Sequence, residues 1–356
     1  MGLGAKSAVV VSPDPGSDAG GTERMCHQVA TALRGLGFGV ELVGPGGPGP
    51  RVVAEHGGTM LWQAGAVRRA ALARDPDLVV TVGHLGWPGR RGPARVHVHT
   101  GNLVRLARHQ AGAWHWKARW GLAGGLAEAM AGRGATVVAV SRQAAEDAAR
   151  LYRARRVTVL TLGVDTGLFR PRDRDTARRR LGLAPDVRYG LFVGRGEAGK
   201  GPDIALAACR RAGWELLAAG TRPVPGSRSL GVLPAEELAW AYAAADALVL
   251  PTAYEGWSYA VGEALAVGVP VVTTPVGWAR DLGRAVPSYR PFLVPREVAA
   301  VTAALGRVAS GDAAAAVAPA RALVLADHTV AAFEGRWRDL LTTVGVLRPE
   351  PVAVTR

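Results

Sequence analysis

The chain has 356 residues, which is long enough for two domains. Of these residues 49% are apolar and 20% are charged, which is typical of globular proteins. This composition excludes a disordered chain, a collagen-like repeat and a small disulfide-held protein, because Cys26 and Cys209 are the only cysteines. The formal net charge of +14 favours anionic partners, and nucleic acid, a membrane surface and nucleotide phosphates all fit it.

The N-terminus does not have the pattern of a secretory signal. Met1–Lys6 leads into only the short apolar run Ala8–Val11 before Pro13. The most apolar stretches, such as Asp246–Pro251 and Val267–Thr273, are far shorter than the roughly 20 residues that span a bilayer. We therefore expect a cytoplasmic protein with reduced thiols that is soluble or at most peripheral to a membrane.

Short runs rich in β-branched residues or leucine alternate with Ala-, Leu- and Arg-rich segments of helical period along the whole chain. This alternation predicts an α/β protein with parallel, doubly wound sheets. In the first half we expect strands at Ala8–Ser12, Gly39–Val43, Leu78–Val82, Val96–His99 and Thr136–Val140, and helices near Glu23–Leu36, Ala64–Ala73 and Gln143–Leu151.

A second series of the same kind predicts a second Rossmann-like domain. Its strands are expected at Tyr189–Val193, Glu215–Ala218, Ala247–Leu250 and Pro270–Thr273, and its helices near Ile204–Arg211, Glu236–Ala244 and Tyr259–Ala266. The Pro-containing, Arg/Asp-rich stretch Phe169–Arg180 suits a connector. We therefore expect domains over residues 1–168 and 187–328, a connector over 169–186 and returning helices over 329–356. Ligands of such sheets bind at the carboxyl ends of the strands, which points to the cleft between the domains.

The segment after the first strand contains Gly20, Gly21, Thr22 and Glu23. The two glycines permit close backbone approach, and the amides of the following helix favour an anion. Thr22 as a simple N-cap is an alternative that is compatible with this interpretation.

His97 and His99 alternate on the fourth predicted strand, and His99 falls at its carboxyl end, facing the expected cleft. A buried, hydrogen-bonded strand histidine is the competing interpretation. No spacing of His, Cys, Asp or Glu resembles a metal site, so no metal is expected.

Trp114, Trp116 and Trp120, together with Lys117 and Arg119, form an aromatic and basic stretch. We favour a helix that packs its indoles inward over a surface that contacts lipid or an aromatic acceptor.

The segment Tyr189–Gly201 reads as a strand, a glycine loop and a cation. It matches the dinucleotide fingerprint G-x-G-x-x-G, but the acidic residue that should end the next strand is missing. It also matches G-x-x-x-x-G-K-[ST], except that Gly201 replaces the hydroxyl that would hold magnesium. Both interpretations share glycine amides beside the cations Arg195 and Lys200, which suit a diphosphate. Lys200 is one of only three lysines among 43 basic residues.

Two carboxylates follow a later strand: Glu255 in a predicted loop and Glu263 in a predicted helix. Paired carboxylates at the end of a strand suit the hydroxyls of a sugar and a ribose, because each carboxylate accepts two hydrogen bonds. The competing interpretation is a solvated loop charge and a solvated helix charge. Two-carboxylate hydrolysis gains no support, since residues eight apart on a continuous helix stand about 12 Å apart rather than ~5 Å.

Together these residues resemble the large retaining glycosyltransferase family 4, of the GT-B fold. The matches follow the family's order along most of the chain. They are the loop Gly20–Glu23, the strand-end His99, the strand Val138–Ser141, the linker residues Gly163–Thr166 and Phe169–Pro171, the pair Arg195 and Lys200, and the two glutamates Glu255 and Glu263.

The resemblance implies roles for these positions. Arg195 and Lys200 would bind the donor diphosphate, Glu263 the ribose, and Glu255 the donor sugar. The amides of Gly20 and Gly21 would border the diphosphate or the acceptor, and His99 would lie beside the reacting centre. The loop residues Gly256, Trp257 and Ser258 would complete the donor site. The family retains anomeric configuration, generally without a protein nucleophile, and usually needs neither metal nor cofactor.

The chain departs from the family at three places. The stretch between Gly220 and Gly231 is short, which concerns the nucleobase pocket; Ser258 replaces a frequent glycine, and Gly199 a frequent acidic residue. We expect sugar transfer from a nucleoside diphosphate sugar to a small-molecule or glycan hydroxyl. The alternatives are a cell-envelope or lipid-linked acceptor, a GT-B epimerase or sugar-phosphate enzyme, an inactive nucleotide-sugar-binding relative, and nucleic-acid binding, which the charge alone favours.

Overall fold

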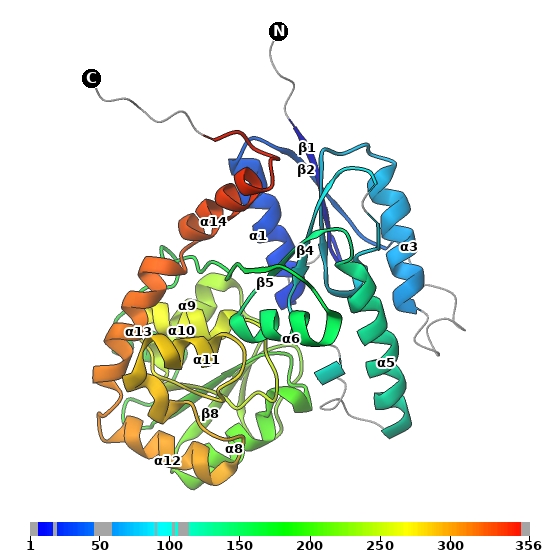
Figure 1. Ribbon diagram of the computed structural model, residues 1–356. Helices are drawn as coiled ribbons and strands as arrows, with labels where there is room; N and C mark the ends of the chain where they lie inside the picture. The colour runs from blue at the N-terminus through cyan, green and yellow to red at the C-terminus, as the bar shows by residue number, and fades with distance from the viewer. Residues whose placement is uncertain are drawn as a thin grey trace, which may run out of the picture.

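The computed structural model describes residues 6–16, 20–45, 59–89, 91–101, 104–105 and 114–349. It contains two parallel β-sheets, each with helices packed against it, joined in one chain (Figure 1). The α/β class and the two doubly wound sheets predicted from the sequence are confirmed.

The first sheet has the strand order β2-β1-β3-β4-β5-β6, and all its strand pairs are parallel. Its strands are β1 (Ser7–Val11), β2 (Gly39–Val43), β3 (Leu78–Val82), β4 (Ala94–His99), β5 (Thr136–Ala139) and β6 (Val157–Val159). Its helices are α1 (Gly21–Gly35), α3 (Thr59–Leu72), the short η1 (Gly83–Leu85), α5 (Trp114–Ala131) and α6 (Arg142–Tyr152). The tryptophan-rich stretch lies in α5 as a helix, while the side chains of Trp114, Trp116 and Trp120 lie outside the described residues.

The second sheet has the order β11-β10-β7-β8-β9 and is also parallel. Its strands are β7 (Tyr189–Val193), β8 (Glu215–Ala219), β9 (Arg228–Gly231), β10 (Ala247–Leu250) and β11 (Val271–Thr273). Its helices are α7 (Arg174–Arg180), η2 (Ala198–Lys200), α8 (Pro202–Arg211), α9 (Ala235–Ala244), α10 (Tyr259–Val267), α11 (Trp278–Ala285), η3 (Pro287–Phe292), α12 (Val298–Ala309) and α13 (Ala314–Asp327).

The chain returns to the first domain through a short parallel bridge. The Val164 amide donates to the His328 carbonyl at 2.7 Å, and the Val330 amide donates to the Val164 carbonyl at 3.2 Å. The last helix, α14 (Val330–Thr343), then packs beside α1 (Figure 1). Two segments of the chain, which we call the connecting segments, therefore run side by side between the domains, one before α7 and one before α14.

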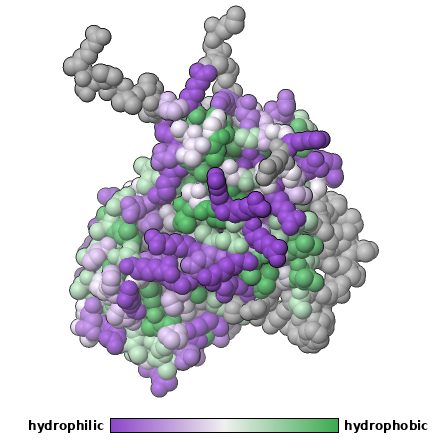
Figure 2. All heavy atoms as spheres, in the orientation of Figure 1, coloured by the Kyte–Doolittle hydropathy of each residue, from purple (hydrophilic) through white to green (hydrophobic). Residues whose placement is uncertain are grey.

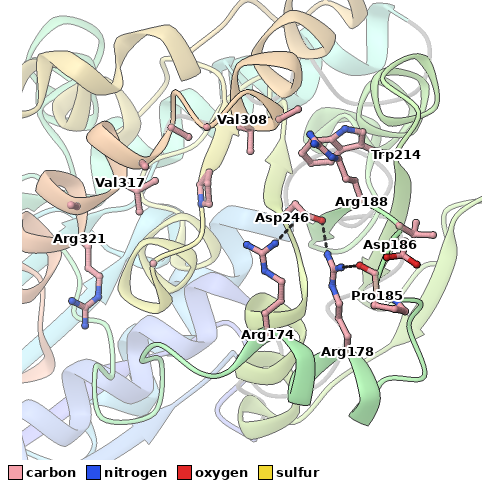
Figure 3. A pocket seen from close by; sticks show the side chains of 18 residues that line it. Arg174, Arg178, Pro185, Asp186, Arg188, Trp214, Asp246, Val308, Val317 and Arg321 are labelled. Carbon is pink, nitrogen blue, oxygen red and sulfur yellow. Dashed lines mark hydrogen bonds and ion pairs between the residues drawn. The ribbon is translucent and has the colours of Figure 1, made fainter.

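The segment 169–186, expected as a connector, contains the helix α7 and is fastened to the second domain. The Asp246 carboxylate accepts from Arg178 at 2.8 Å, from Arg174 at 2.9 Å and from the Tyr189 amide at 2.7 Å. Asp246, Arg174 and Arg178 line a cavity of about 750 Å³ at the amino edge of the second sheet (Figure 3). The cavity contains none of the predicted site residues, which follow the opposite, carboxyl ends of the strands.

The two domains also meet away from the connecting segments, between α6 and α11. The Arg142 amide donates to Asp281 at 2.9 Å, and Arg280 pairs with Glu146 at 3.3 Å. Figure 2 shows hydrophilic side chains gathered in a band across this face. Charged groups thus hold part of the contact between the domains.

Within the described part of the chain, no single helix is long and apolar enough to cross a membrane. The pair α12 and α13 meets that length and composition only when taken together, with a bend of 96° between the two helices.

Candidate active site

The loop after β7 carries the two predicted cations on a tight backbone. Gly196 and Gly201 have φ angles of +71° and +72°, a region that side-chain-bearing residues rarely adopt. A Cβ on Gly201 would lie 2.5 Å from the Pro251 carbonyl oxygen, so this loop presses directly on the end of β10. A glycine is therefore needed at position 201 for close packing, where the motif G-x-x-x-x-G-K-[ST] would have a hydroxyl residue.

Lys200 and Glu255 form an ion pair between these two loops. Their side chains are 24% and 18% exposed, which leaves both within reach of a ligand. Arg195 is 58% exposed and pairs with Glu197 of its own loop at 3.4 Å. The structure thus brings Lys200 and Glu255 together, whereas the ion pair of Arg195 stays inside the glycine loop.

Arg296 fastens the glycine loop to the end of β10. Its Nε donates to the Pro251 carbonyl at 3.0 Å, and its Nη2 donates to the Ala198 carbonyl at 2.5 Å. The Ala253 amide donates to the Gly199 carbonyl at 2.7 Å. These bonds fix the two loops relative to each other, a contribution of Arg296 that the sequence did not indicate.

The loop that carries Glu255 abuts the carboxyl end of β4 in the other domain. A Cβ on Gly256 would lie 1.8 Å from the Thr100 carbonyl oxygen, and a Cβ on Gly277 would lie 2.2 Å from the Glu255 carbonyl oxygen. Only glycine fits at both positions. The carboxyl edges of the two sheets therefore face each other, as the sequence predicted for a cleft.

Gly20 and Gly21 stand at the start of α1. Gly20 is the N-cap in extended conformation, and no side chain caps the helix among the described residues. The alternative of Thr22 as N-cap is wrong, since Thr22 lies inside the first turn. With no side-chain cap among the described residues, the backbone amides of this turn suit an anion, and that role stays a prediction.

Glu263 is 1% exposed and its carboxylate is held from two sides. The Tyr242 hydroxyl donates to Oε2 at 2.9 Å, and Arg24 of α1 lies 2.5 Å from Oε1. Burial acts to lower the pKa of Arg24, but the Glu263 carboxylate together with Tyr259 and Tyr242 outweighs it, and the pKa is raised. The residue expected to hold the ribose is thus engaged with a cation of the opposite domain.

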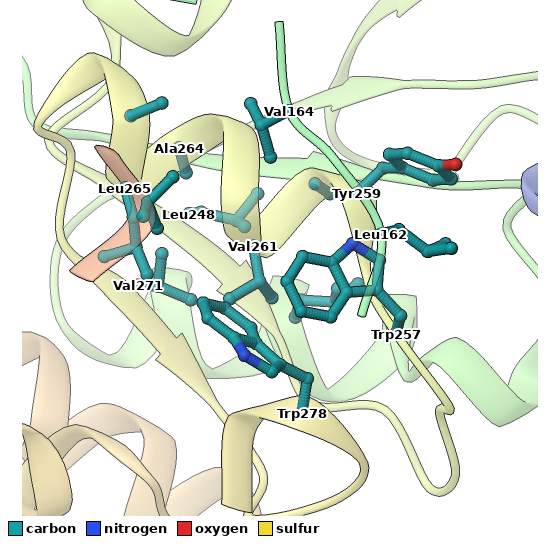
Figure 4. Close-up of a cluster of buried hydrophobic side chains, with 14 of the residues drawn as sticks. Leu162, Val164, Leu248, Trp257, Tyr259, Val261, Ala264, Leu265, Val271 and Trp278 are labelled. Atoms are coloured by element: carbon teal, nitrogen blue, oxygen red, sulfur yellow. The ribbon is translucent and has the colours of Figure 1, made fainter. Parts of the chain in front are cut away.

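Trp257 and Ser258 lie between Glu255 and α10. Trp257 points into a buried apolar cluster with Leu162 and Val261 (Figure 4), and its ring lies 4.3 Å from that of Trp278. Only the backbone of Trp257 therefore remains for a donor. Ser258 is the N-cap residue of α10 but makes no side-chain cap hydrogen bond.

His99 is 1% exposed and packs edge-on against Tyr152, with 5.1 Å between ring centroids. Its Nε2 has no hydrogen-bond partner among the described residues. His97 is equally buried and its Nδ1 lies 3.0 Å from the Thr81 hydroxyl. Burial lowers the pKa of His99 to about 4, so the ring is neutral at pH 7.

A polar cluster that the sequence did not indicate lies in the first domain near Tyr152, the ring that packs against His99. Asp147, 3% exposed, accepts from Arg105 at 3.1 Å and from the Tyr254 hydroxyl at 3.3 Å. Tyr254 directly precedes Glu255, so the cluster reaches the donor loop. The described residues hold no group of three or more His, Cys, Asp and Glu side chains suited to a metal ion.

Comparison with known families decides the classification. Residues 19–168 match the family model for Glycosyltransferase Family 4, and residues 188–310 match that for Glycosyl transferases group 1. The chain belongs to glycosyltransferase family 4. The expected family is confirmed, and so is the GT-B fold.

Curated relatives and solved structures agree with this assignment. The chain is 32% identical over 182 residues to the D-inositol 3-phosphate glycosyltransferase of Segniliparus rotundus, a match that covers 43% of this chain and 40% of that relative. A shorter match, 49% identical over 79 residues, is to the enzyme of that name from a Nocardioides species, covering 22% of this chain and 16% of that one. The matches thus span less than half the length of these relatives.

Two solved structures share the fold over nearly the whole chain. Sucrose-phosphate synthase from Thermosynechococcus elongatus has a TM-score of 0.79 and 22% identity, covering 96% of this chain and 99% of that one. HepE from Anabaena, solved in complex with UDP and glucose, has a TM-score of 0.68 and 17% identity, covering 95% and 100%.

Proposed function

We propose that this member of glycosyltransferase family 4 transfers a sugar from a nucleoside diphosphate sugar to an acceptor hydroxyl. The observation that carries the proposal is the partly exposed pair of Lys200 and Glu255 where the carboxyl edges of the two sheets meet. A cation for a diphosphate and a carboxylate for sugar hydroxyls stand side by side there. The solved complexes of Anabaena HepE with UDP and UDP-glucose make UDP the first donor nucleotide to test.

In the proposed reaction the bond between the sugar C1 and the diphosphate oxygen breaks, and a bond from the acceptor oxygen to C1 forms on the same face. The acceptor proton passes to the departing diphosphate. Lys200 and Arg195 stabilise the negative charge that develops on that group, and Glu255 orients the sugar through its hydroxyls. No protein nucleophile and no metal take part in this scheme, so activity should withstand EDTA.

For the acceptor we propose a small hydroxylated molecule, bound on the first-domain side near His99 and Asp147. The relatives named for D-inositol 3-phosphate make that compound the first acceptor to test. Natural-product scaffolds and cell-envelope glycans complete the panel, with product structure and anomeric configuration determined by NMR. A cytoplasmic location fits both a nucleotide-sugar donor and two cysteines without disulfides.

Thermal unfolding with UDP, GDP, ADP and dTDP in the presence of EDTA tests the donor. At a hundredfold excess over Kd, one bound nucleotide adds about 2.7 kcal/mol, which raises the Tm by roughly 5–10 °C. We expect one nucleotide to give this shift and Lys200→Ala to abolish it. Arg188→Ala, an exposed arginine at the opposite edge of the same sheet, is the matched control and should keep the shift. A chain that no nucleotide stabilises would contradict the proposal.

A further inference from the structure

The helices α1 and α10 contact each other across the domain boundary through two residue pairs. Arg24 and Gln28 are four apart on α1, and Tyr259 and Glu263 are four apart on α10, so each helix presents both residues on one face. Arg24 pairs with Glu263 at 2.5 Å, and the Tyr259 hydroxyl donates to Gln28 at 3.2 Å. The Arg24 guanidinium also lies 4.2 Å from the centre of the Tyr259 ring.

Hydrogen bonds join this contact to the first of the connecting segments. Gln28 donates to the Gly163 carbonyl at 2.8 Å and accepts from the Gly163 amide at 3.2 Å, just before the bridge residue Val164. The same helix α1 begins at Gly21, directly after Gly20, and the family resemblance assigns the amides of both glycines to the border of the diphosphate or the acceptor. The α1–α10 contact therefore links the helix that follows the glycine loop, and the helix that carries Glu263, to the segment that connects the domains.

Burial on the two sides of the ion pair is unequal. The Glu263 side chain is 1% exposed, whereas that of Arg24 is 35% exposed. A ribose cannot reach the Glu263 carboxylate while Arg24 covers Oε1. Arg24 can turn toward solvent because about a third of its side chain, 35%, is already exposed. Tyr242 can stay in place because each carboxylate oxygen has two lone pairs.

We propose that Arg24 competes with the donor ribose for Glu263, so that binding of the nucleotide opens the ion pair between the two domains. This inference rests on the proposed function, since it needs a ribose-bearing donor in this cleft. It makes Arg24 a residue that sets donor affinity from the acceptor-side domain. The free energy needed to open the pair is subtracted from the binding of every ligand that requires Glu263.

The test compares UDP, or whichever nucleoside diphosphate the thermal screen selects, with its 2′,3′-dideoxy analogue. In Arg24→Ala we expect the Kd of the full nucleotide to fall about tenfold, because the pair no longer has to open, and the Kd of the analogue to stay within about twofold. Isothermal titration calorimetry measures both. In Glu263→Gln the advantage of the full nucleotide over the analogue should shrink, and Arg24→Ala added to it should have no further effect.

The matched control is Arg34→Ala, on the same helix α1, where the side chain donates to the Val40 carbonyl within the first domain. It should leave both affinities unchanged. If Arg24→Ala weakens the nucleotide and the analogue equally, Arg24 binds the diphosphate and the inference is wrong. An unchanged ratio of the two Kd values also overturns it.

Failure of the proposed function has a different signature. If no nucleotide binds the native protein, or if binding ignores Lys200→Ala, the donor site itself is misassigned and this inference falls with it. Binding that depends on Lys200 but not on Arg24 overturns the inference alone.

Discussion

Lys200 and Glu255 neutralise each other in the structure. Substitution of Lys200 should therefore weaken nucleotide binding, whereas substitution of Glu255 should not. Lys200→Ala removes a diphosphate ligand, whereas Glu255→Gln frees Lys200 from its counter-ion. For Glu255→Gln we expect a UDP affinity equal to or a few-fold above that of the native protein, with transfer reduced about 100-fold because the sugar is no longer oriented. Calorimetry with UDP and initial rates with the UDP-sugar measure the two effects. A joint loss of affinity in both variants would mean that Glu255 binds the nucleotide rather than the sugar.

At the residue scale, the sequence predicted where the candidate residues lie better than which partners they have, and their roles stay predictions. Lys200 and Glu255 lie in short loops directly after strands, where position along the chain nearly fixes position in space. The partners of Glu263 could not be predicted in this way. Arg24 follows the glycine loop and Tyr242 lies in α9, but nothing in their local pattern says that both converge on one carboxylate. Such convergence depends on how the two domains are docked.

At the scale of the elements, the carboxylate of Asp246 holds α7 against the start of β7. Its side chain is 14% exposed and accepts from Arg174, Arg178 and the Tyr189 amide. We expect Asp246→Asn to destabilise the second domain by about 2–4 kcal/mol, since it leaves the nearly buried Arg178 without its counter-ion. Urea unfolding measures the change. The control is Asp186→Asn, which changes an exposed carboxylate that lines the same cavity and should alter the free energy of unfolding by no more than about 0.5 kcal/mol. An equally small effect of Asp246→Asn would contradict the role of Asp246 in holding α7 against β7.

Some of the elements that the sequence missed have a weak pattern, although the amphipathic helices α11 and α12 were missed as well. The edge strands β6 and β9 are short and largely exposed, and β9 contains Arg228 and Ser229, so neither has a run of buried β-branched residues. The helix α7 is arginine-rich and was taken for a connector, although Asp173 caps it. Buried strands such as β3 and β10 were predicted with the observed bounds, because both faces are covered and every residue is apolar or β-branched.

At the scale of the whole molecule, the two-domain arrangement was predictable and the closure of the cleft was not. The alternation of strands and helices requires two sheets, and their carboxyl edges must face a common ligand. The contacts that bring the domains together are made by residues such as Arg24, Arg280 and Glu146, which resemble ordinary solvated helix charges in the sequence. Some of the 43 basic residues are thus paired with carboxylates inside the molecule rather than available to an external polyanion.

The whole molecule should also be sensitive to mild acid, because four histidines are kept neutral by burial. Burial lowers the pKa of His84 and His99 to about 4, and that of His97 and His328 to about 3, from an ordinary value of 6.5. Between pH 6.5 and about 4 the unfolded chain binds protons that the folded chain does not, so stability falls as the pH falls through this window. Each histidine contributes a slope of about 1.4 kcal/mol per pH unit.

We therefore expect the Tm to be nearly constant above pH 7 and to fall steeply from pH 6.5 toward pH 4.5. The carboxylates with lowered pKa, Glu41, Glu236 and Glu237, carry an ordinary value of 4.5, so their contribution begins only at the lower limit of this window. Differential scanning calorimetry in buffers matched for ionic strength measures the profile. His97→Gln should reduce the slope by about one proton, because the substituted side chain cannot titrate. A profile that stays flat down to pH 4.5 would show that these rings take up protons in the folded chain, and the neutral state assigned to His99 would then be wrong as well. A slope that His97→Gln leaves unchanged would show the same for His97 alone.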